Sequence, residues 1–453
     1  MSDLRWQNSL QQILGPQGLT SQPDAIRRWE WEGSPPCAIA FPESREQVGE
    51  LIRLADAERL RLIPFGRGTK LRQGGASQPA DLALSLQRLN KVCDYPASDL
   101  TISVEAGVSI RDLGARLGTQ GQMLPLDVPF AERATIGGTV AANSSGPSRL
   151  SYGTWRDIVL GVQFVTADGK LAKGGGKVVK NVAGYDIPKL MIGSLGSLAV
   201  IVEITFKVFP IPPASATIAL HLRSAEQASR AVLRVLNSPL IPQALDLVDS
   251  AAGTLANQPE LRPAPFTLLA GVTGSEEVLA RFEHELPALV RAEGLERFEV
   301  FRERRQAELW NAVQEITPSF LATHPEGLVV KASLPLDRMG EFIRQAHAAS
   351  EKHGIAQATV ARAGSGVVYT YLHAEPGIPE AVGSESLCGT SDRLIRKAER
   401  CGGRAIVEWC PVELKSKVNL WGTLGDDFAS MRLLKAALDP QNILSPGRFY
   451  GGI

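Results

Sequence analysis

The sequence predicts an α+β protein of two or three domains, the number expected for 453 residues. Three patterns indicate this fold class. Apolar residues recur with period two over residues 198–208, which is typical of a strand with one buried face. Apolar residues at helical spacing mark residues 46–59 as a helix. Beyond Pro210, Pro212 and Pro213, strand, helix and strand patterns follow one another, which predicts a separate domain.

The first part of the chain predicts a short series of strands and helices. We expect a helical lead-in over residues 1–33, followed by the helix at 46–59. The expected strands lie at residues 37–41, 61–64 and 100–106. A further helix is predicted to begin after Ser109, because Asp112 three residues later is typical of a capping box.

The second part predicts two similar series of elements. The first series has strands at 217–222, 245–248 and 266–272, with helices that begin at Ser224 and Glu276. The second series has strands at 328–332, 356–362 and 366–372, with a helix near 337–352. This order is similar to two ferredoxin-like halves in one antiparallel sheet.

Composition excludes several classes of function. Lys and Arg together number 48, as do Asp and Glu, so we expect no nucleic-acid partner and no anionic membrane surface. No run of about 18 apolar residues and no signal-peptide core is found, which predicts a cytoplasmic protein without a membrane span. The five cysteines, at 37, 93, 388, 401 and 410, form no CxxC pair, so neither disulfides nor an iron–sulfur cluster are expected.

Two glycine-rich loops carry the strongest functional signal. Residues 62–71 (LIPFGRGTKL) run from an apolar strand into a loop with Arg67 and Lys70, and residues 135–146 (TIGGTVAANSSG) hold a second glycine pair. Glycines let backbone N–H groups turn toward one point and bind an anion, so two such loops predict a dinucleotide-like ligand. A Rossmann site is not predicted, because position 71 is Leu where that pattern needs glycine.

Further motifs accompany these loops in order along the chain. They are YGTWRDIVLG at 152–161, VTADG at 165–169, KNVAGYDIPKL at 180–190, IGSLGSL at 192–198 and LDPQNILSPGRF at 438–449. Together with the loops they resemble the FAD-binding domain of the vanillyl-alcohol-oxidase (PCMH) superfamily. Within it, the chain is most similar to the FAD-binding subunits of bacterial glycolate oxidases.

The resemblance implies an arrangement of four segments. These are the lead-in at 1–33, a PCMH-type FAD-binding domain of two α+β subdomains at 34–212, a ferredoxin-like antiparallel-sheet cap over the flavin at 213–403, and a C-terminal segment at 404–453 that returns to the FAD domain. The cofactor contacts that it implies are Pro64, Phe65, Gly66, Arg67, Gly68, Thr69, Lys70, Asp127, Thr135, Gly137, Gly138, Ala141, Asn143, Gly146, Gly193, Gly196 and Val202. Gly66 and Gly68 are expected to need positive φ angles.

The link to the cofactor is expected to be non-covalent. No histidine lies between residues 1 and 220, which excludes a histidyl link from the first half of the chain. Cys93 is a formal alternative, but it lies outside every loop that matches the superfamily's flavin contacts.

The expected catalytic positions depart from the superfamily. Its D-2-hydroxyacid dehydrogenases carry G-H-x-G-D-G-N-x-H, whose histidines and acid build a metal or carboxylate site, whereas this chain reads ARAGSGVVY over 361–369. Arg362 and Tyr369 take the histidine places, Ser365 takes the Asp place, and Trp409 stands at a later histidine position. Because a guanidinium cannot ligate a divalent metal, no metal site is expected.

Two interpretations of these residues are open. In the first, Arg362 clamps a substrate carboxylate with two parallel hydrogen bonds, Tyr369 and Tyr371 donate beside it, and His373 acts as the base. In the second, Arg362 pairs with a neighbouring acid and His373 lies on a strand surface, so that both have structural roles.

The resemblance implies an FAD-dependent oxidoreductase subunit that acts on the CH–OH group of glycolate or another small D-2-hydroxyacid. Its partners would be a second flavin subunit and an iron–sulfur subunit that receives the electrons, since this chain has no cluster cysteines. It would lie in the cytoplasm or peripherally at the inner membrane through these partners. The alternatives are a non-catalytic relay or assembly subunit and a stand-alone FAD-dependent oxidase of another alcohol.

Overall fold

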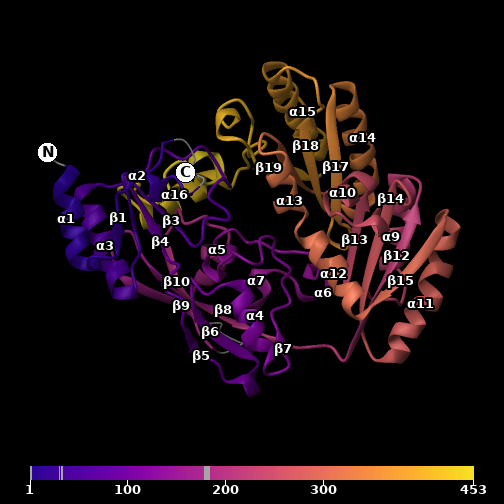
Figure 1. Ribbon diagram of the computed structural model, residues 1–453, viewed down its shortest axis with the longest axis horizontal. Coiled ribbons are helices and arrows are strands. Elements are labelled where there is room, and N and C mark those ends of the chain that lie inside the picture. Colours follow the sequence, from indigo (N-terminus) through magenta and orange to yellow (C-terminus); the bar gives the residue numbers. More distant parts are fainter. Residues whose placement is uncertain (1–2, 30, 32–33, 178–183) are drawn as a thin grey trace. The chain divides into compact units, whose positions relative to one another are not determined.

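The computed structural model describes residues 3–29, 31, 34–177 and 184–453, which form two compact units (Figure 1). Unit 1 holds the chain as far as Ser145, Thr154–Ile211 and Thr423–Ile453, and unit 2 holds Gly146–Gly153 and Pro212–Gly422. The chain passes from unit 1 to unit 2 at Pro212, within the proline-rich segment of residues 210–213. The start of the motif at 180–190 and five residues of the lead-in, 1–2, 30 and 32–33, lie outside the described residues.

The first sheet of unit 1 places the glycine-rich loop. Its strand order is β1-β2-β4-β3. The strands are β1 (Leu19–Thr20), β2 (Ala38–Ala40), β3 (Leu62–Phe65) and β4 (Leu82–Ser85). β2, β4 and β3 are parallel, and α3 (Arg45–Glu58) supplies the crossover that a parallel pair needs. The carboxyl end of β3 runs directly into the loop at 66–70.

The N-terminal segment is part of unit 1 rather than a separate lead-in. Its helices are α1 (Asp3–Leu14) and α2 (Pro23–Ile26), and β1 between them pairs with β2. Trp6, Leu10 and Leu14 are buried in the core of unit 1, against α3 among other elements. The predicted helices are present, but burial of these three side chains makes them part of the domain.

The second sheet of unit 1 is antiparallel, with the order β5-β6-β10-β8-β9. Its strands are β5 (Val92–Asp94), β6 (Thr101–Glu105), β8 (Val159–Val165), β9 (Leu171–Gly175) and β10 (Val200–Lys207). The helices around it are α4 (Ile110–Gly118), α5 (Ile136–Ala141), α7 (Trp155–Ile158) and α8 (Ile187–Met191), and β7 (Gln122–Met123) pairs with β11 (Phe209–Pro210). The predicted strand at 198–208 is thus the central strand of this sheet.

Unit 2 contains one antiparallel sheet of eight strands, in the order β15-β12-β14-β13-β17-β18-β16-β19. Its strands are β12 (Ala214–Leu222), β13 (Ala244–Asp249), β14 (Phe266–Gly274), β15 (Arg297–Arg302), β16 (Leu328–Ser333), β17 (Ile355–Arg362), β18 (Val367–Ala374) and β19 (Arg404–Trp409). Each half shows the ferredoxin-like order of fourth, first, third and second strand, and the halves join where β13 pairs with β17. The predicted α+β class and the ferredoxin-like antiparallel sheet are confirmed.

The two faces of this sheet differ. The large apolar core lies beneath α9 (Ala225–Leu236), α11 (Glu276–Val290), α14 (Met339–Lys352) and α15 (Glu380–Arg400). Because side chains alternate along a strand, Val368 and Leu372 join this core while Tyr369 and Tyr371 belong to the other face. That face also contacts α10 (Ser250–Leu255), α12 (Glu303–Gln314) and α13 (Ile316–Thr323).

Two boundaries differ from those expected. The chain returns to unit 1 at Thr423 rather than at residue 404, because β19 completes the sheet of unit 2 by pairing with β16. Gly146–Gly153, which includes α6 (Arg149–Tyr152), belongs to unit 2, where Gln243 Nε2 donates to Ser148 Oγ at 3.1 Å. In the described part of the chain, no helix is both long enough and apolar enough to span a bilayer.

Candidate functional site

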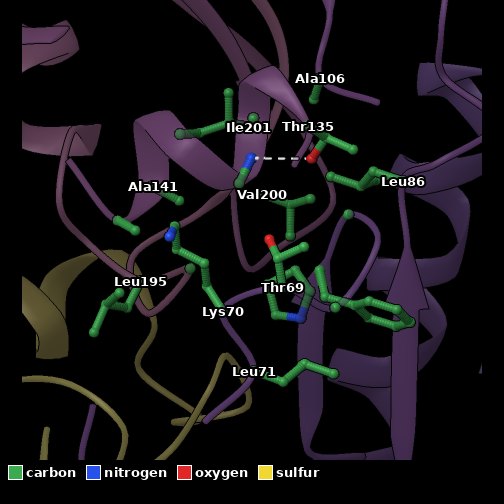
Figure 2. A pocket seen from close by; sticks show the side chains of 18 of the residues that line it. Thr69, Lys70, Leu71, Leu86, Ala106, Thr135, Ala141, Leu195, Val200 and Ile201 are labelled. Atoms are coloured by element: carbon green, nitrogen blue, oxygen red, sulfur yellow. Dashed lines mark hydrogen bonds between the residues drawn. The ribbon is translucent and has the colours of Figure 1, made fainter. Parts of the chain in front are cut away.

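The glycine-rich loop after β3 and the segment that begins α5 line one cavity in unit 1 (Figure 2). The space between the residues that line it is about 680 Å³, a value that includes the solvent at its open side. The residues that line it are Pro64, Phe65, Gly66, Arg67, Gly68, Thr69, Lys70, Leu71, Leu86, Ala106, Thr135, Gly137, Gly138, Ala141, Ala142, Leu195, Gly196, Ala199, Val200, Ile201 and Arg448. The two loops singled out in the sequence therefore meet.

Two glycines allow this close approach for different reasons. A Cβ atom at Gly66 would lie 2.0 Å from Thr135 Oγ1, so any side chain there would push the loops apart. Gly68 has a φ of +76°, a left-handed conformation that favours glycine. The expected positive φ is thus confirmed at Gly68 and wrong at Gly66, where packing against Thr135 requires glycine instead.

Three successive backbone N–H groups of the first loop have no hydrogen-bond partner in the described part of the chain. Among the residues that the structure describes, no hydrogen bond uses the N–H of Arg67, Gly68 or Thr69, and all three residues line the cavity. Successive N–H groups in a turn form a concavity that binds anions. In the second loop, by contrast, the N–H of Gly137 donates to Ala106 O (2.8 Å) and that of Gly138 donates to Thr135 Oγ1 (3.3 Å).

The two basic side chains of the first loop are placed differently. Lys70 is buried and extends along the cavity toward Ala141 (Figure 2), with Nζ 5.2 Å from the centre of the Phe130 ring. Arg67 is half-buried and also borders a second, more open hollow. Lys70 is therefore the side chain better placed to balance negative charge within the cavity.

Apolar side chains form the rest of the wall. Val200 and Ile201 at the start of β10 lie near Thr135 (Figure 2), and Leu86 and Ala106 complete this part of the wall. Such a wall suits a flat ring. Sequence reasoning did not single out these residues of the cavity wall, although the apolar run at 198–201 was a usable signal.

Five predicted cofactor residues do not line the cavity: Asp127, Asn143, Gly146, Gly193 and Val202. Val202 lies one residue beyond the wall, where its carbonyl accepts from the N–H of Ala106 (2.9 Å). Gly193 contacts α5, since its N–H donates to Val140 O (3.1 Å). Gly146 belongs to unit 2. Arg448, by contrast, lines the cavity and was missed, although its motif was recognised.

Two ion pairs, one buried and one half-buried, lie on the face of the unit 2 sheet that carries Tyr369. Arg362 forms an ion pair with Asp246 on β13, and both side chains are buried. Lys331 pairs with Glu408 at 2.9 Å, and its Nζ lies 5.5 Å from the centre of the Tyr369 ring. Arg362 Cζ lies 5.8 Å from the same ring. Tyr369 therefore lies between two cations, each of which has its own carboxylate.

The environment of Arg362 leaves one donor unused. Burial disfavours its charged form, but the attraction of Asp246 and of Tyr369 outweighs burial, so the pKa of Arg362 is raised above its ordinary value. Asp246 engages Nη1, while the buried Nε has no hydrogen-bond partner among the described residues. As the second interpretation expects, Arg362 pairs with an acid.

His373 is not part of this cluster. It lies four residues beyond Tyr369 on β18, which is about 13 Å along the strand. Its Nδ1 is 3.0 Å from Ala374 O, and its ring stacks on His324 with centroids 3.8 Å apart. The structure therefore brings Arg362 and Tyr369 together and leaves His373 apart. No group of three or more His, Cys, Asp or Glu side chains able to hold a metal is found in the described ranges.

Comparison with known proteins agrees with this geometry. Residues 36–175 match the model of the FAD binding domain, and residues 211–449, more than half of the chain, match that of the C-terminal domain of FAD linked oxidases. The chain belongs to the FAD-linked oxidase family. It has FAD as its cofactor and is an oxidoreductase.

Two relatives and one solved structure illustrate what this FAD-linked oxidase is similar to. D-2-hydroxyglutarate dehydrogenase of Xanthomonas citri pv. viticola is 30% identical over 98% of this chain and 96% of its own. Glycolate oxidase subunit GlcD of Bacillus subtilis is 24% identical over 97% and 95%. p-Cresol methylhydroxylase shares the fold, with a TM-score of 0.81 and 14% identity over 99% and 97%. The predicted PCMH-type fold is confirmed.

The cavity in this FAD-linked oxidase fits FAD in two respects. The unpartnered N–H groups at 67–69 suit a diphosphate, and a Cβ at Gly66 would fill the cradle beside them. The apolar wall at Val200 and Ile201 suits a flat aromatic ring. Both kinds of surface lie in one cavity, as a ligand with a phosphate-rich middle requires.

Acid precipitation is expected to release FAD and leave a colourless pellet. Among the described residues that line the cavity there is no histidine, cysteine or tyrosine, so this part of the chain offers no nucleophile for a covalent flavin link there. Burial, assisted by nearby Glu203, raises the pKa of Cys93 to about 12, so its thiol is not activated. A pellet that stays yellow after washing in acid would contradict this expectation.

Proposed function

We propose that this FAD-linked oxidase binds FAD without a covalent link in the cavity of unit 1 and is a subunit of a dehydrogenase for glycolate or a related D-2-hydroxyacid. The named relatives act on hydroxyacids, which supports this substrate class. Bound FAD would supply the acceptor for the two electrons of the oxidation. The chain's own task is then to hold the acid and to position its reacting carbon.

The observation that carries the proposal is that Nε of Arg362 has no hydrogen-bond partner among the described residues. A buried donor without a partner costs about 1–3 kcal/mol, and a substrate carboxylate would relieve that cost. Asp246 holds the guanidinium in place and Tyr369 flanks it. In this arrangement Arg362 binds the carboxylate and Tyr369 positions the acid, while His373 is too far along β18 to act as the base at the same substrate.

We propose that electrons leave for a partner iron–sulfur subunit. The cysteine spacing of this chain provides no cluster ligands, so a one-electron acceptor must come from elsewhere. A second flavin subunit that carries the superfamily's histidines would complete such a complex.

Anaerobic reduction of the purified chain tests this function. Glycolate, D-lactate or D-2-hydroxyglutarate is expected to bleach the flavin absorbance, with a lower apparent affinity in Arg362→Lys. Lysine keeps the charge opposite Asp246 but lacks the Nε donor. Arg338→Lys, on the surface of unit 2, serves as the matched control and should behave as wild type. Flavin that stays oxidised with all three acids would contradict a substrate site in this chain.

A second candidate function is electron relay without a substrate site. The ion pairs Arg362–Asp246 and Lys331–Glu408 favour it, because a neutralised cluster attracts an anionic substrate weakly. In this case the flavin would bleach only when the partner subunits are co-expressed with the chain. The same anaerobic titration, run with and without partners, separates the two functions.

A further inference from the structure

The C-terminal segment Thr423–Ile453 crosses back to unit 1 and lies against β3, the strand that leads into the glycine-rich loop. The N–H of Leu62 donates to Ile443 O (2.7 Å), and that of Ser445 donates to Leu62 O (2.7 Å). Figure 1 shows α16 (Phe428–Leu438) in yellow near the indigo elements of unit 1. The segment thereby extends the first sheet beyond β3.

Arg448 ties this segment to the loop that lines the cavity. Its Nη2 donates to Lys70 O (2.6 Å) and Leu71 O (3.3 Å), and its Nε donates to Gln73 O (3.1 Å). The side chain is buried, and no acidic side chain of the described ranges pairs with it. Burial therefore lowers the pKa of Arg448 to about 10. A buried cation satisfied only by carbonyl groups is a costly arrangement that an anion would relieve.

Lys435 connects the same segment to the stretch at 195–197. Its Nζ donates to Ser197 O (2.8 Å) and to Leu444 O (2.8 Å), and it pairs with Asp439. Ser197 directly follows Leu195 and Gly196, which line the cavity. The C-terminal segment thus holds the first glycine-rich loop through Arg448 and the stretch at 195–197 through Lys435, and both cations are buried.

We propose that residues 423–453 act as a clamp whose closure is coupled to cofactor binding, with Arg448 as the residue that positions the loop and balances the charge of the FAD diphosphate. The proposal rests on the assignment of the unit 1 cavity to FAD. Of the two cations, Lys435 already has a carboxylate partner, whereas Arg448 has none among the residues that the structure describes. The diphosphate, which is the anionic part of FAD, is the missing counter-charge.

Titration of apo-protein with FAD and with riboflavin, which lacks the diphosphate, tests the role of Arg448. Arg448→Met is expected to bind FAD about tenfold or more weakly, because a hydrogen-bonded charge is lost. Its affinity for riboflavin should change much less, and Arg448→Lys should recover part of the FAD affinity. Arg432→Met, an exposed position on α16, is the matched control and should match wild type for both ligands.

Hydrogen exchange on wild-type protein tests the coupling without any substitution. FAD is expected to slow exchange of the Ser445 and Arg448 amides as well as that of the loop at 66–73. Protection of the loop alone, with the C-terminal amides unchanged, would overturn the clamp, as would equal losses of FAD and riboflavin affinity in Arg448→Met. Failure of wild-type protein to bind FAD at all would instead refute the assignment of the cavity.

Discussion

Replacing Gly66 by valine is expected to give folded protein without flavin. The new Cβ would lie 2.0 Å from Thr135 Oγ1, and valine adds two methyl groups to that collision. Thr135 cannot move freely, since its hydroxyl accepts from the N–H of Gly138 and caps α5. Overpacking of about 1–3 kcal/mol, with about 1 kcal/mol for the strained cap, corresponds to a roughly 30- to 1000-fold loss of FAD affinity.

The flavin absorbance of purified Gly66→Val, followed by titration of the apo-protein with FAD, measures this loss. Gly114→Ala is a matched control, because a Cβ at Gly114 in α4 meets nothing within 4 Å. The control should be fully yellow. Stoichiometric FAD in Gly66→Val would show that the loops at Gly66 and Thr135 do not jointly form the cofactor site.

Removing Asp246 is expected to destabilise unit 2 strongly, while the FAD content of the purified protein stays unchanged. Asp246→Ala leaves the buried guanidinium of Arg362 without its carboxylate, and breaking a buried ion pair in this way costs about 3–5 kcal/mol. The midpoint of urea unfolding should fall, whereas the cavity lies in unit 1 and should keep FAD.

Two companion variants make this test specific. The double variant Asp246→Leu and Arg362→Met should recover most of the loss, because apolar side chains of similar volume replace buried ion pairs well. Glu285→Ala, which breaks the exposed pair with Arg281 on α11, should leave the midpoint unchanged. An unfolding midpoint unchanged in Asp246→Ala would show that the pair with Arg362 contributes nothing to the fold.

The sequence predicted those parts of the fold that depend on local pattern. The period-two run at 198–208 and the cap at Ser224 mark a strand and a helix by themselves, and both are present in β10 and α9. The glycine loops were found because glycine has a distinct backbone role. The two similar series of elements in unit 2 could also be predicted, because each ferredoxin-like half contains the same strands and helices in the same order along the chain.

The parts that escaped prediction depend on contacts between distant residues. Nothing near Arg362 in the sequence points to Asp246 on β13, and nothing near Arg448 points to the carbonyls of residues 70–73. The chain was expected to return to unit 1 at residue 404, from the position of a motif alone. It returns only at Thr423, because β19 pairs with β16. Gly66 shows a finer limit: its need for glycine was predicted, but the cause lies in Thr135, which sequence alone cannot place beside it.

The split make-up of unit 1 has a consequence for biosynthesis. Unit 2 is nearly continuous over Pro212–Gly422, so its sheet is complete once that stretch has left the ribosome. β3 of unit 1 gains its bonds to Ile443 and Ser445 only when the following residues have been translated. Unit 1 is therefore the first unit to be translated and the last to be completed. Until the C-terminal segment is made, β3 has an open edge that can pair wrongly with other strands, and chaperones would have to shield it.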